Sequence, residues 1–364
     1  MSGPAERVRR RIAVVGAGVV GTALAYYLAR DGAQVLLIDE RHACGGVTKD
    51  SFGWVGLSAS ASDPDQAALR HLASTDLDRI EDELPLPVSL RRNGALSWSA
   101  ERGNPGSVPT FHQEPTSSVR IVSRPEIQKL EPSLINPPQS AVFAENDGSV
   151  DPVALTLSLL RGAQHFGATL SPETRVREVH ISNGRVSGLR TVTGTIDVDT
   201  VVLAAGTETT GLARTAGVRV PINPSPCILM RFTTPKRLLN RIVSGPEFEF
   251  RQATDSMLLA AEDYVDDSPE NGPEALARLT LETIHNEIAG SRDVALSTVS
   301  VGRRPIPEDG RPVIGSAAVG GLYVVSAHAA VALACGIGRL AAEEIIQDRE
   351  LEALKPFRPA RFAG

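Results

Sequence analysis

Three glycines and one aspartate near the start of the chain have the types and spacing needed to hold a dinucleotide. Gly16, Gly18 and Gly21 form a GxGxxG pattern, and Asp39 follows at the end of the next apolar segment. In such a pattern the first glycine allows a tight turn, the second lets the backbone approach a diphosphate, and the third lets a helix pack closely on a strand. A carboxylate at the end of the second strand accepts hydrogen bonds from ribose hydroxyls. We expect Asp39 to take this role rather than its neighbour Glu40, which more naturally begins the loop.

The elements that must position these residues are visible around them. "RIAVV" is β-branched and predicts a buried strand, "VVGTALAYYLARDG" has helical apolar spacing and ends at Gly32, and "QVLLID" predicts a second strand. This β-α-β unit places the glycines on its first turn, which is the context in which the fingerprint is informative. The helix would present its N-terminus, with Val19 and Val20, to the negative phosphates.

The same stretch is the one serious candidate for a membrane or secretion segment. It is uncharged from Ile12 to Ala29, close to the roughly 18 apolar residues that suggest a transmembrane helix. The glycines interrupt it, however, and a second apolar strand follows where a signal peptide would show a cleavage site. We therefore expect no membrane segment and a cytoplasmic protein.

Composition narrows the class of partner. The chain has 364 residues, more than one hydrophobic core usually serves, so two domains are expected. The net charge is -6 and the sequence has no long basic block, so nothing in it indicates binding of nucleic acid. This favours a small-molecule ligand. The three cysteines have neither metal-ligand nor disulfide spacing, so we expect reduced core thiols and no metal site.

Sequence patterns typical of a nucleotide-binding α/β domain occur in three separate stretches of the chain. Two segments with a different pattern lie between them. Three short strand-like pieces with "NG" and "TG" turns after residue 174 predict an antiparallel meander, and "VVLAAG" predicts a further central strand. We expect a discontinuous α/β architecture: residues 9–84, 145–220 and 302–349 form a Rossmann-like domain with a parallel sheet and a β-meander. Residues 85–144 and 221–301 would form an α+β substrate domain with an antiparallel sheet.

The order of motifs over nearly the whole chain resembles the FAD-dependent oxidoreductases that include glycine oxidase, D-amino acid oxidase and monomeric sarcosine oxidase. The matching stretches are "VVGAGVVGTALAYYLARDGAQVLLID", "GGVTKDSFGW", "GSVDPVALTLSLLRGAQHFGATL", "VVLAAG", "VGRRPIPEDGRPVIG" and "GLYVVSAHAAVALACGIGRLAAEEI". The resemblance implies FAD as the cofactor. It adds these residues to the expected FAD contacts: Thr48, Ser51, Phe52, Gly53, Val176, Ala205, Gly206, Ala329 and Ala330.

The resemblance also implies a substrate-binding arginine. Arg304 matches the arginine of the family's "GxRPxxxDGxPxIG" stretch, which holds the substrate carboxylate in members that oxidise amino acids. A guanidinium fixes the plane of a carboxylate with two parallel hydrogen bonds and so aims the adjacent Cα–H. Arg303 is the alternative residue for this role.

The turn before the last helix departs from the family pattern. Where relatives commonly have a glycine-bearing turn, this chain has "AHAAVALACG". His328 is expected either to lie over the flavin edge, as a candidate catalytic residue, or to cap the helix. Lys49 is the second catalytic candidate, with a solvated loop lysine as the alternative. The stretch lacks the cysteine that tethers flavin in some relatives, so the FAD is expected to be noncovalent.

The expected activity is oxidation of an amino acid or a carboxylate-bearing secondary amine, by hydride transfer from the α-carbon to FAD N5, followed by hydrolysis of the imine. Two alternatives stay open. The same fold would oxidise a 2-hydroxy acid if His328 acted as general base. Alternatively, the chain would be a flavin-binding subunit of a larger complex, and a homo-oligomer is also compatible with the sequence. An NAD(P) dehydrogenase would explain the glycines but not the later motifs.

Overall fold

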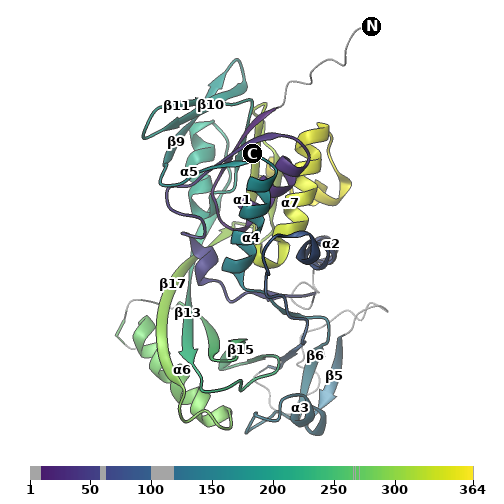
Figure 1. Ribbon diagram of the computed structural model, residues 1–364, viewed down its shortest axis with the longest axis vertical. Coiled ribbons are helices and arrows are strands. Elements are labelled where there is room, and N and C mark those ends of the chain that lie inside the picture. Colours follow the sequence, from purple (N-terminus) through teal and green to yellow (C-terminus); the bar gives the residue numbers. More distant parts are fainter. Residues whose placement is uncertain are drawn as a thin grey trace.

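Two large sheets at opposite ends of an elongated molecule organise the chain (Figure 1). The computed structural model describes residues 10–57, 63–99, 119–264, 266, 268–269 and 271–363. A six-stranded sheet occupies the upper part of Figure 1 and an eight-stranded sheet the lower part. Strands of the first sheet come from both ends and the middle of the chain, so the nucleotide-domain pattern is discontinuous in sequence but continuous in space.

The six-stranded sheet has the order β18-β19-β12-β1-β2-β8. Its strands are β1 (Arg11–Val15), β2 (Gln34–Ile38), β8 (Thr169–Ser171), β12 (Thr200–Leu203), β18 (Val313–Ser316) and β19 (Leu322–Ser326). All neighbours pair in parallel except β18, which runs antiparallel to β19. β1 is central and fully buried after Arg11, because both faces of the sheet are covered.

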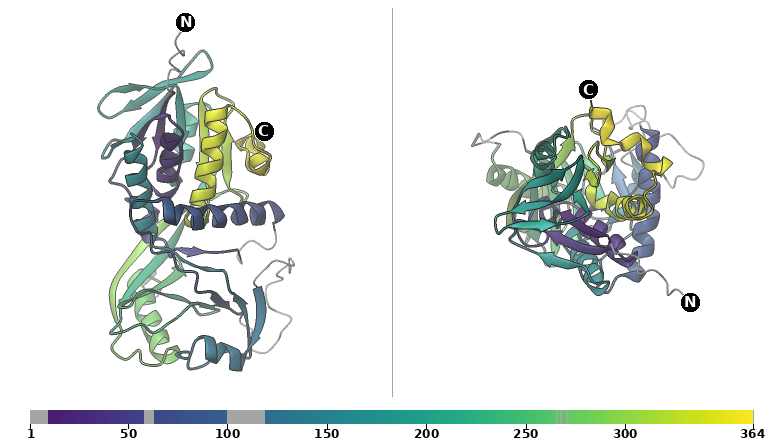
Figure 2. Two further views of the ribbon diagram at one scale, coloured as in Figure 1. Left: turned by 45° about the vertical axis from the view of Figure 1, so that its right-hand side comes forward. Right: turned by 90° about the horizontal axis from the view of Figure 1, so that it is seen from above.

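Helices cover one face of this sheet. They are α1 (Val19–Arg30), α2 (Pro64–Glu83), α4 (Pro152–His165) and α7 (Ala330–Gln347). Asp63 and Asp151 cap α2 and α4 with side-chain hydrogen bonds, and each is followed by a proline. In the left view of Figure 2, α2 lies across the middle of the molecule, below α1 and α7, and it packs on α7.

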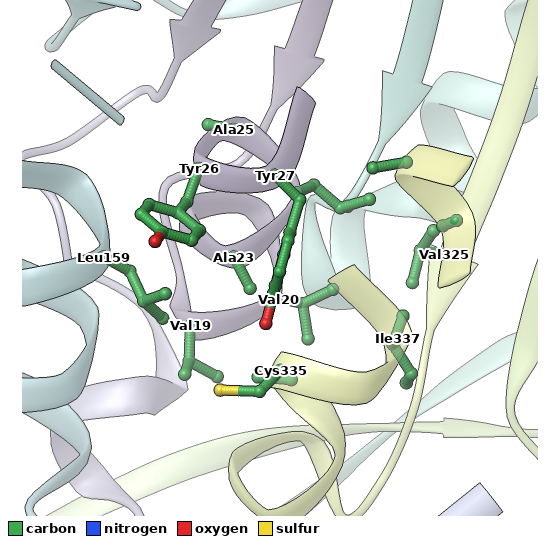
Figure 3. Close-up of a cluster of buried hydrophobic side chains, with 14 of the residues drawn as sticks. Val19, Val20, Ala23, Ala25, Tyr26, Tyr27, Leu159, Val325, Cys335 and Ile337 are labelled. Atoms are coloured by element: carbon green, nitrogen blue, oxygen red, sulfur yellow. The ribbon is translucent and has the colours of Figure 1, made fainter. Parts of the chain in front are cut away.

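Helix α1 is buried along nearly its whole length between α4 and α7. Figure 3 shows Tyr26 pointing towards Leu159 of α4 and Tyr27 towards Cys335 of α7. Close approach needs small residues: a Cβ placed on Gly338 would lie 2.9 Å from the Cβ of Ala23. The uncharged stretch of the sequence is therefore uncharged because it forms the centre of a packed core.

The opposite face of the sheet is covered by the predicted meander and a short helix. The meander strands are β9 (Val176–Ser182), β10 (Arg185–Thr191) and β11 (Thr195–Asp197), in the order β11-β10-β9, and the helix is α5 (Thr209–Thr215). Asn183 and Gly184 both have positive φ between β9 and β10, as the "NG" turn predicts.

The eight-stranded sheet has the order β17-β13-β16-β15-β14-β4-β6-β5. Its strands are β4 (Ala95–Ser97), β5 (Val119–Ser123), β6 (Ser140–Ala144), β13 (Ile222–Thr233), β14 (Ile242–Gly245), β15 (Phe248–Thr254), β16 (Met257–Asp263) and β17 (Ala295–Pro307). Only β4 and β14 pair in parallel; the other neighbours are antiparallel. Helices α3 (Arg124–Leu130) and α6 (Pro273–Glu287) pack on one face, over residues such as Met230, Phe232 and Phe250.

The segment "VSLRRNGALSW" alternates as a strand does, but the strand within it is short. Only Ala95–Ser97 pairs as β4, and Arg91 makes an isolated bridge. Gly94 has a φ of +83°, which breaks the extended conformation between the two.

The long strands β13 and β17 join the two ends of the molecule. They pair along their whole lengths, from Ile222 beside Pro307 to Thr233 beside Ala295. Ile222 reaches the core below the six-stranded sheet, where its N–H donates to Thr210 Oγ1 over 3.0 Å. Between the sheets lie the 3-10 helices η1 (Val47–Asp50) and η3 (Gly206–Glu208) and the small sheet of β3 (Trp54–Val55) and β7 (Gly148–Ser149). The chain closes with two further 3-10 helices, η4 (Glu352–Phe357) and η5 (Pro359–Phe362).

No helix among the described residues has the length and apolar character required to span a bilayer. The domain boundaries given above stay a prediction.

Candidate functional site

A first cavity, of about 970 Å³, lies beyond the carboxyl ends of β1, β2 and β12. Open parallel sheets bind their ligands at this edge. The predicted cofactor residues that line it are Gly16, Gly18, Val19, Val20, Asp39, Glu40, Thr48, Val176, Ala205, Gly206 and Ala330. Lys49 also lines this cavity, whereas Gly21 lies behind it within α1.

The glycine turn forms a cradle that side chains would fill. Gly16 has a φ of +109°, and a Cβ there would lie 2.3 Å from the carbonyl oxygen of Ala204. A Cβ on Gly21 would lie 1.7 Å from the carbonyl oxygen of Gly16, so only glycine lets α1 begin this close to β1. A Cβ on Gly18, the N-cap of α1, would lie 3.2 Å from Thr48 Oγ1.

The N-terminus of α1 carries no acidic residue in its first turn, so the positive end of the helix faces the cavity without a negative charge of its own. The N–H of Val19 donates to Thr48 Oγ1 over 3.2 Å, which ties η1 to this helix end. Unbalanced helix N-termini next to a glycine turn are where proteins hold diphosphates. The residues present therefore fit a dinucleotide cofactor.

Asp39 is held in place at the end of β2. Its Oδ2 accepts from the N–H of Ala17 over 2.6 Å and its Oδ1 from the N–H of Arg41 over 2.8 Å. Glu40 instead lies within ion-pair distance of two arginines, Arg41 at 3.3 Å and Arg175 at 3.5 Å. Backbone donors thus fix the Asp39 carboxylate beside the cavity, while Glu40 belongs to a charged loop.

A second cavity, of about 520 Å³, lies between the first cavity and the face of the eight-stranded sheet that carries no helix. The two cavities share the lining residues Asp50 and Ala330. Predicted site residues that line the second cavity are Ser51, Phe52, Gly53, Arg304, His328, Ala329 and Ala330. The loop from Ser51 to Gly53, predicted to contact the cofactor, is thus found beside the second cavity.

Arg304 and Arg303 occupy different cavities. Adjacent residues of a strand point to opposite faces, so β17 directs Arg304 into the second cavity and Arg303 into the first. Arg304 Nη2 donates to Asp263 Oδ1 over 2.7 Å, Ser225 Oγ over 3.0 Å and the Pro226 carbonyl over 3.3 Å. Its buried Nε finds no acceptor among the described residues. Arg304 is therefore a positioned cation with a donor left over.

His328 opens into the second cavity just before α7. The structure places Ala329, not His328, at the N-cap of that helix, and no side-chain hydrogen bond caps it. Removal from bulk water lowers the pKa of His328, and the positive charges of Arg304 and Arg70 lower it further. The imidazole is therefore neutral at pH 7.

Lys49 is exposed and lies on the side of η1 that borders the first cavity. The carbonyl oxygen of Lys49 accepts from Arg231 Nη2 over 2.5 Å, which fastens η1 to β13. The structure does not bring the Lys49 side chain together with Arg304 and His328.

A buried arginine that the sequence did not single out fastens the loop beside the second cavity. Arg251 of β15 donates from Nε to the carbonyl of Phe52 and from Nη2 to that of Val150 over 3.4 Å. Its guanidinium also lies over the Phe52 ring, 5.4 Å from the centroid. Burial lowers the pKa of Arg251 to about 10, so it remains charged at pH 7.

Three carboxylates face the same cavity from β15 and β16: Glu249, Glu262 and Asp263. Burial raises the pKa of Glu249 to about 7, and the negative charges of Glu262 and Asp263 contribute to the rise. Burial also raises the pKa of Glu262. Asp263 is paired with Arg304, so the charges in the cavity are partly balanced.

Sequence reasoning missed Arg251 and the three carboxylates because the β15–β16 hairpin was not recognised. The available signal was the alternation in "FEFRQA", in which Phe248 and Phe250 face the core and Glu249 and Arg251 the other side. Such alternation predicts a strand with one polar face. It does not distinguish a polar face that meets solvent from one that lines a cavity.

Comparison with known proteins gives one family and several relatives. The family model described as FAD dependent oxidoreductase (DAO) matches residues 11–344. A D-amino acid dehydrogenase from Paramagnetospirillum magneticum is 25% identical over 92% of this chain and 94% of its own. A 4-methylaminobutanoate oxidase (formaldehyde-forming) from Paenarthrobacter nicotinovorans is 28% identical over 58% of this chain, but the match spans only 26% of that longer protein.

Solved structures share the fold. An L-proline dehydrogenase from P. horikoshii superimposes with a TM-score of 0.85 at 20% identity, covering 98% of each chain. Glycine oxidase from Bacillus cereus gives 0.83 at 19% identity, covering 95% of this chain and 98% of its own. Iminodiacetate oxidase from Chelativorans sp. gives 0.83 at 24% identity, covering 96% of this chain and 99% of its own. These similarities confirm the expected arrangement of a mixed, mostly parallel sheet and a separate antiparallel sheet.

Proposed function

Because the chain belongs to the DAO family of FAD-dependent oxidoreductases, we propose that it oxidises an amino acid or a secondary amine bearing a carboxylate, using noncovalent FAD. The enzyme is of the amino acid oxidase or dehydrogenase type. The substrate would lose a hydride from its α-carbon and become an imine, which water hydrolyses to an oxo acid or aldehyde and an amine.

The position of Arg304 carries this proposal. It is a fixed guanidinium in a cavity of about 520 Å³, and that cavity joins the dinucleotide-type cavity at Asp50 and Ala330. A carboxylate bound by Arg304 would hold the rest of a small substrate at the boundary between the cavities. Relatives named for proline, glycine, iminodiacetate and 4-methylaminobutanoate act on molecules that contain both an amine and a carboxylate, which supports the same substrate class.

In the first cavity, the N-terminus of α1 would hold the diphosphate, Asp39 the ribose and the backbone at Val176 the adenine. At the start of α7 the N–H of Ala330 donates to the carbonyl of His328 over 2.7 Å, so the N–H of Ala329 would face the flavin end. Bound FAD supplies the hydride acceptor, and the protein supplies position and electrostatic field. The cavity residues would keep the reacting carbon beside this boundary.

Oxidation of a 2-hydroxy acid is the second candidate function. Such a reaction needs a base for the hydroxyl proton, and the neutral imidazole of His328 in the second cavity meets that requirement. Under the amine hypothesis His328 is not needed as a base, so His328→Ala separates the two. It would abolish hydroxy acid oxidation but leave most of an amine oxidase activity.

The test begins with the purified chain and its visible spectrum. We expect a flavin spectrum, release of FAD on acid precipitation, and bleaching under anaerobic conditions by D- or L-amino acids or N-methyl amino acids. Bleaching by 2-hydroxy acids alone would support the second candidate. A colourless protein that does not take up added FAD would exclude both.

A further inference from the structure

Asp50 lies where the two cavities meet. It is the last residue of η1, is 9% exposed and lines both cavities. Its carboxylate makes no hydrogen bond or ion pair with any residue that the structure describes. The carboxylate is open to the cavities and has no donor from the described protein residues, so it is available to a cationic or hydrogen-bonding ligand there.

The nearby donors of the protein are already engaged or point elsewhere. Ser51 Oγ donates to the carbonyl of Val47 over 2.9 Å, and Arg231 donates to the carbonyl of Lys49. Lys49 is exposed and borders only the first cavity. Arg304 is paired with Asp263 through Nη2, and its unpartnered Nε makes no hydrogen bond with Asp50. The missing partner of Asp50 is therefore not supplied by these neighbours.

Asp50 packs against β17 close to Arg304. A Cβ placed on Gly302 would lie 3.1 Å from the Cβ of Asp50 and 3.4 Å from the Sγ of Cys227. Gly302 and Arg304 are two residues apart on an extended strand, about 7 Å, and face the same side. The thiol of Cys227 lies within electrostatic reach of both Arg304 and Asp50.

Asp50 and Arg304 both line the second cavity, so a ligand that carries an amine and a carboxylate on one carbon can meet both side chains there. Arg304 offers positive charge at one end, and Asp50 offers negative charge at the end that borders the first cavity. The nitrogen, and with it the α-carbon, would then lie at the boundary between the cavities.

We propose that the carboxylate of Asp50 binds the amino group of the substrate and accepts one of its protons. In that step one N–H bond of the ammonium breaks, an O–H bond forms on Asp50, and the electron pair stays on nitrogen. The neutral amine that results can stabilise the loss of hydride from the neighbouring carbon. This inference rests on the proposed function, and it makes Asp50 the residue that selects amines over hydroxy acids.

Other ionisable groups face the same space and belong to the electrostatic balance of this step. They include Lys49 on η1, Cys227 on β13, Glu249 on β15, Glu262 and Asp263 on β16, Arg303 and Arg304 on β17, Arg70 on α2, Asp147 before β7, and His328 before α7. Asp50 differs from the other carboxylates because it alone among them borders both cavities.

Three ligands of nearly equal shape test the proposal without turnover: 2-aminoisobutyrate, 2-hydroxyisobutyrate and pivalate. They differ only in carrying an ammonium, a hydroxyl or a methyl group, and none has an α-hydrogen that could leave as hydride. Binding to the FAD-loaded protein is measured by calorimetry and by perturbation of the flavin spectrum. The variants are Asp50→Asn, Asp50→Glu, and Asp255→Asn as a control for an exposed carboxylate in the β15–β16 turn.

Wild type is expected to bind 2-aminoisobutyrate at least about 10-fold more tightly than pivalate, the size of a hydrogen bond to a charged group. Asp50→Asn should lose most of this preference, Asp50→Glu should keep part of it, and Asp255→Asn should behave as wild type. Affinity for FAD, measured by flavin fluorescence, should be unchanged in Asp50→Asn.

Two results would overturn the inference. One is a wild type with no preference for the ammonium ligand. The other is an Asp50→Asn variant that keeps the preference while binding FAD more weakly, which would assign Asp50 to the cofactor. Neither affects the proposed function, which fails separately if no amine bleaches the flavin of the wild-type protein.

Discussion

Arg303 and Arg304 are neighbours on β17, yet their side chains open into different cavities. Adjacent side chains of a strand point to opposite faces, so two arginines that are neighbours in sequence face different ligands. Arg304 is fixed by Asp263 and Ser225, whereas Arg303 borders the dinucleotide-type cavity.

Replacing the two arginines in turn should therefore give different defects. Arg304→Gln should lower kcat/KM for a carboxylate substrate by roughly 10- to 150-fold, since a hydrogen bond to a charged group contributes about 1.5–3 kcal/mol. Arg303→Gln should leave substrate affinity nearly unchanged and alter FAD affinity instead. Steady-state kinetics and flavin fluorescence measure the two effects. Equal loss of substrate affinity in both variants would contradict the assignment of Arg304.

The glycine turn gives a test that separates steric clash from backbone strain. Gly16 and Gly32 have similar positive φ values, +109° and +92°, but only Gly16 has a neighbour where a Cβ would go. Gly32→Ala should cost only the strain of about 1–2 kcal/mol. Gly16→Ala should in addition displace the turn and lose FAD. Thermal unfolding with and without FAD reports both. Similar behaviour of the two variants would mean that the close approach to Ala204 is unimportant.

Arg251 should act on the substrate side through the loop that it fastens. Arg251→Met leaves the carbonyls of Phe52 and Val150 without their donor, at about 1–3 kcal/mol for each buried acceptor. A lower melting temperature and slower anaerobic flavin reduction are expected together. Arg237→Met, which removes a surface ion pair with Asp255, is the matched control. Loss of stability with an unchanged reduction rate would show that the loop position does not matter for the reaction.

Glu249 should make stability depend on pH. Its pKa is raised from 4.5 to about 7 by burial and neighbouring carboxylates, so the folded protein binds more protons than the unfolded chain between these values. The contribution of Glu249 to the free energy of unfolding is fully present below pH 4.5. It is lost as the pH rises to 7, and the loss is at most about 3 kcal/mol.

The variant Glu249→Gln removes this dependence. It should be more stable than wild type at pH 8 and equally stable near pH 4.5, measured by urea unfolding at each pH. Glu247→Gln, an exposed position two residues earlier, should show no such difference. A Glu249→Gln variant that is less stable than wild type at pH 8 would mean that the carboxylate has a cationic partner at that pH.

The first cavity could be predicted from the sequence because local rules determine it. Gly21 is required by its contact with the carbonyl of Gly16 inside one β-α-β unit, and Asp39 follows from the end of the second strand. The long apolar stretch likewise specifies a buried helix, as Tyr27 and its neighbours confirm. These features depend on residues close together in the chain.

The second cavity depends on contacts between distant segments, which spacing alone does not reveal. Arg304 could be predicted as a substrate-binding residue only because it matches a motif of the family that the sequence resembles. Asp50 has no local signal: its burial results from the approach of η1 to Gly302, more than two hundred residues away in sequence. Arg251 is similar, since its polar partners are carbonyl groups of the loop at Phe52 and of Val150.

The burial of α1 between α4 and α7 also constrains how the chain can be made. A ribosome releases α1 early, but the surface that covers Ala23 and Tyr27 comes from α7, which emerges some three hundred residues later. One edge of β1 likewise stays unpaired until β12, which begins at Thr200, has been synthesised. During synthesis the nascent chain must therefore carry an apolar helix and an open strand edge, the features that promote misassembly. Release of the chain before α7 is complete would leave α1 uncovered, so this protein is expected to rely on chaperone protection until translation ends.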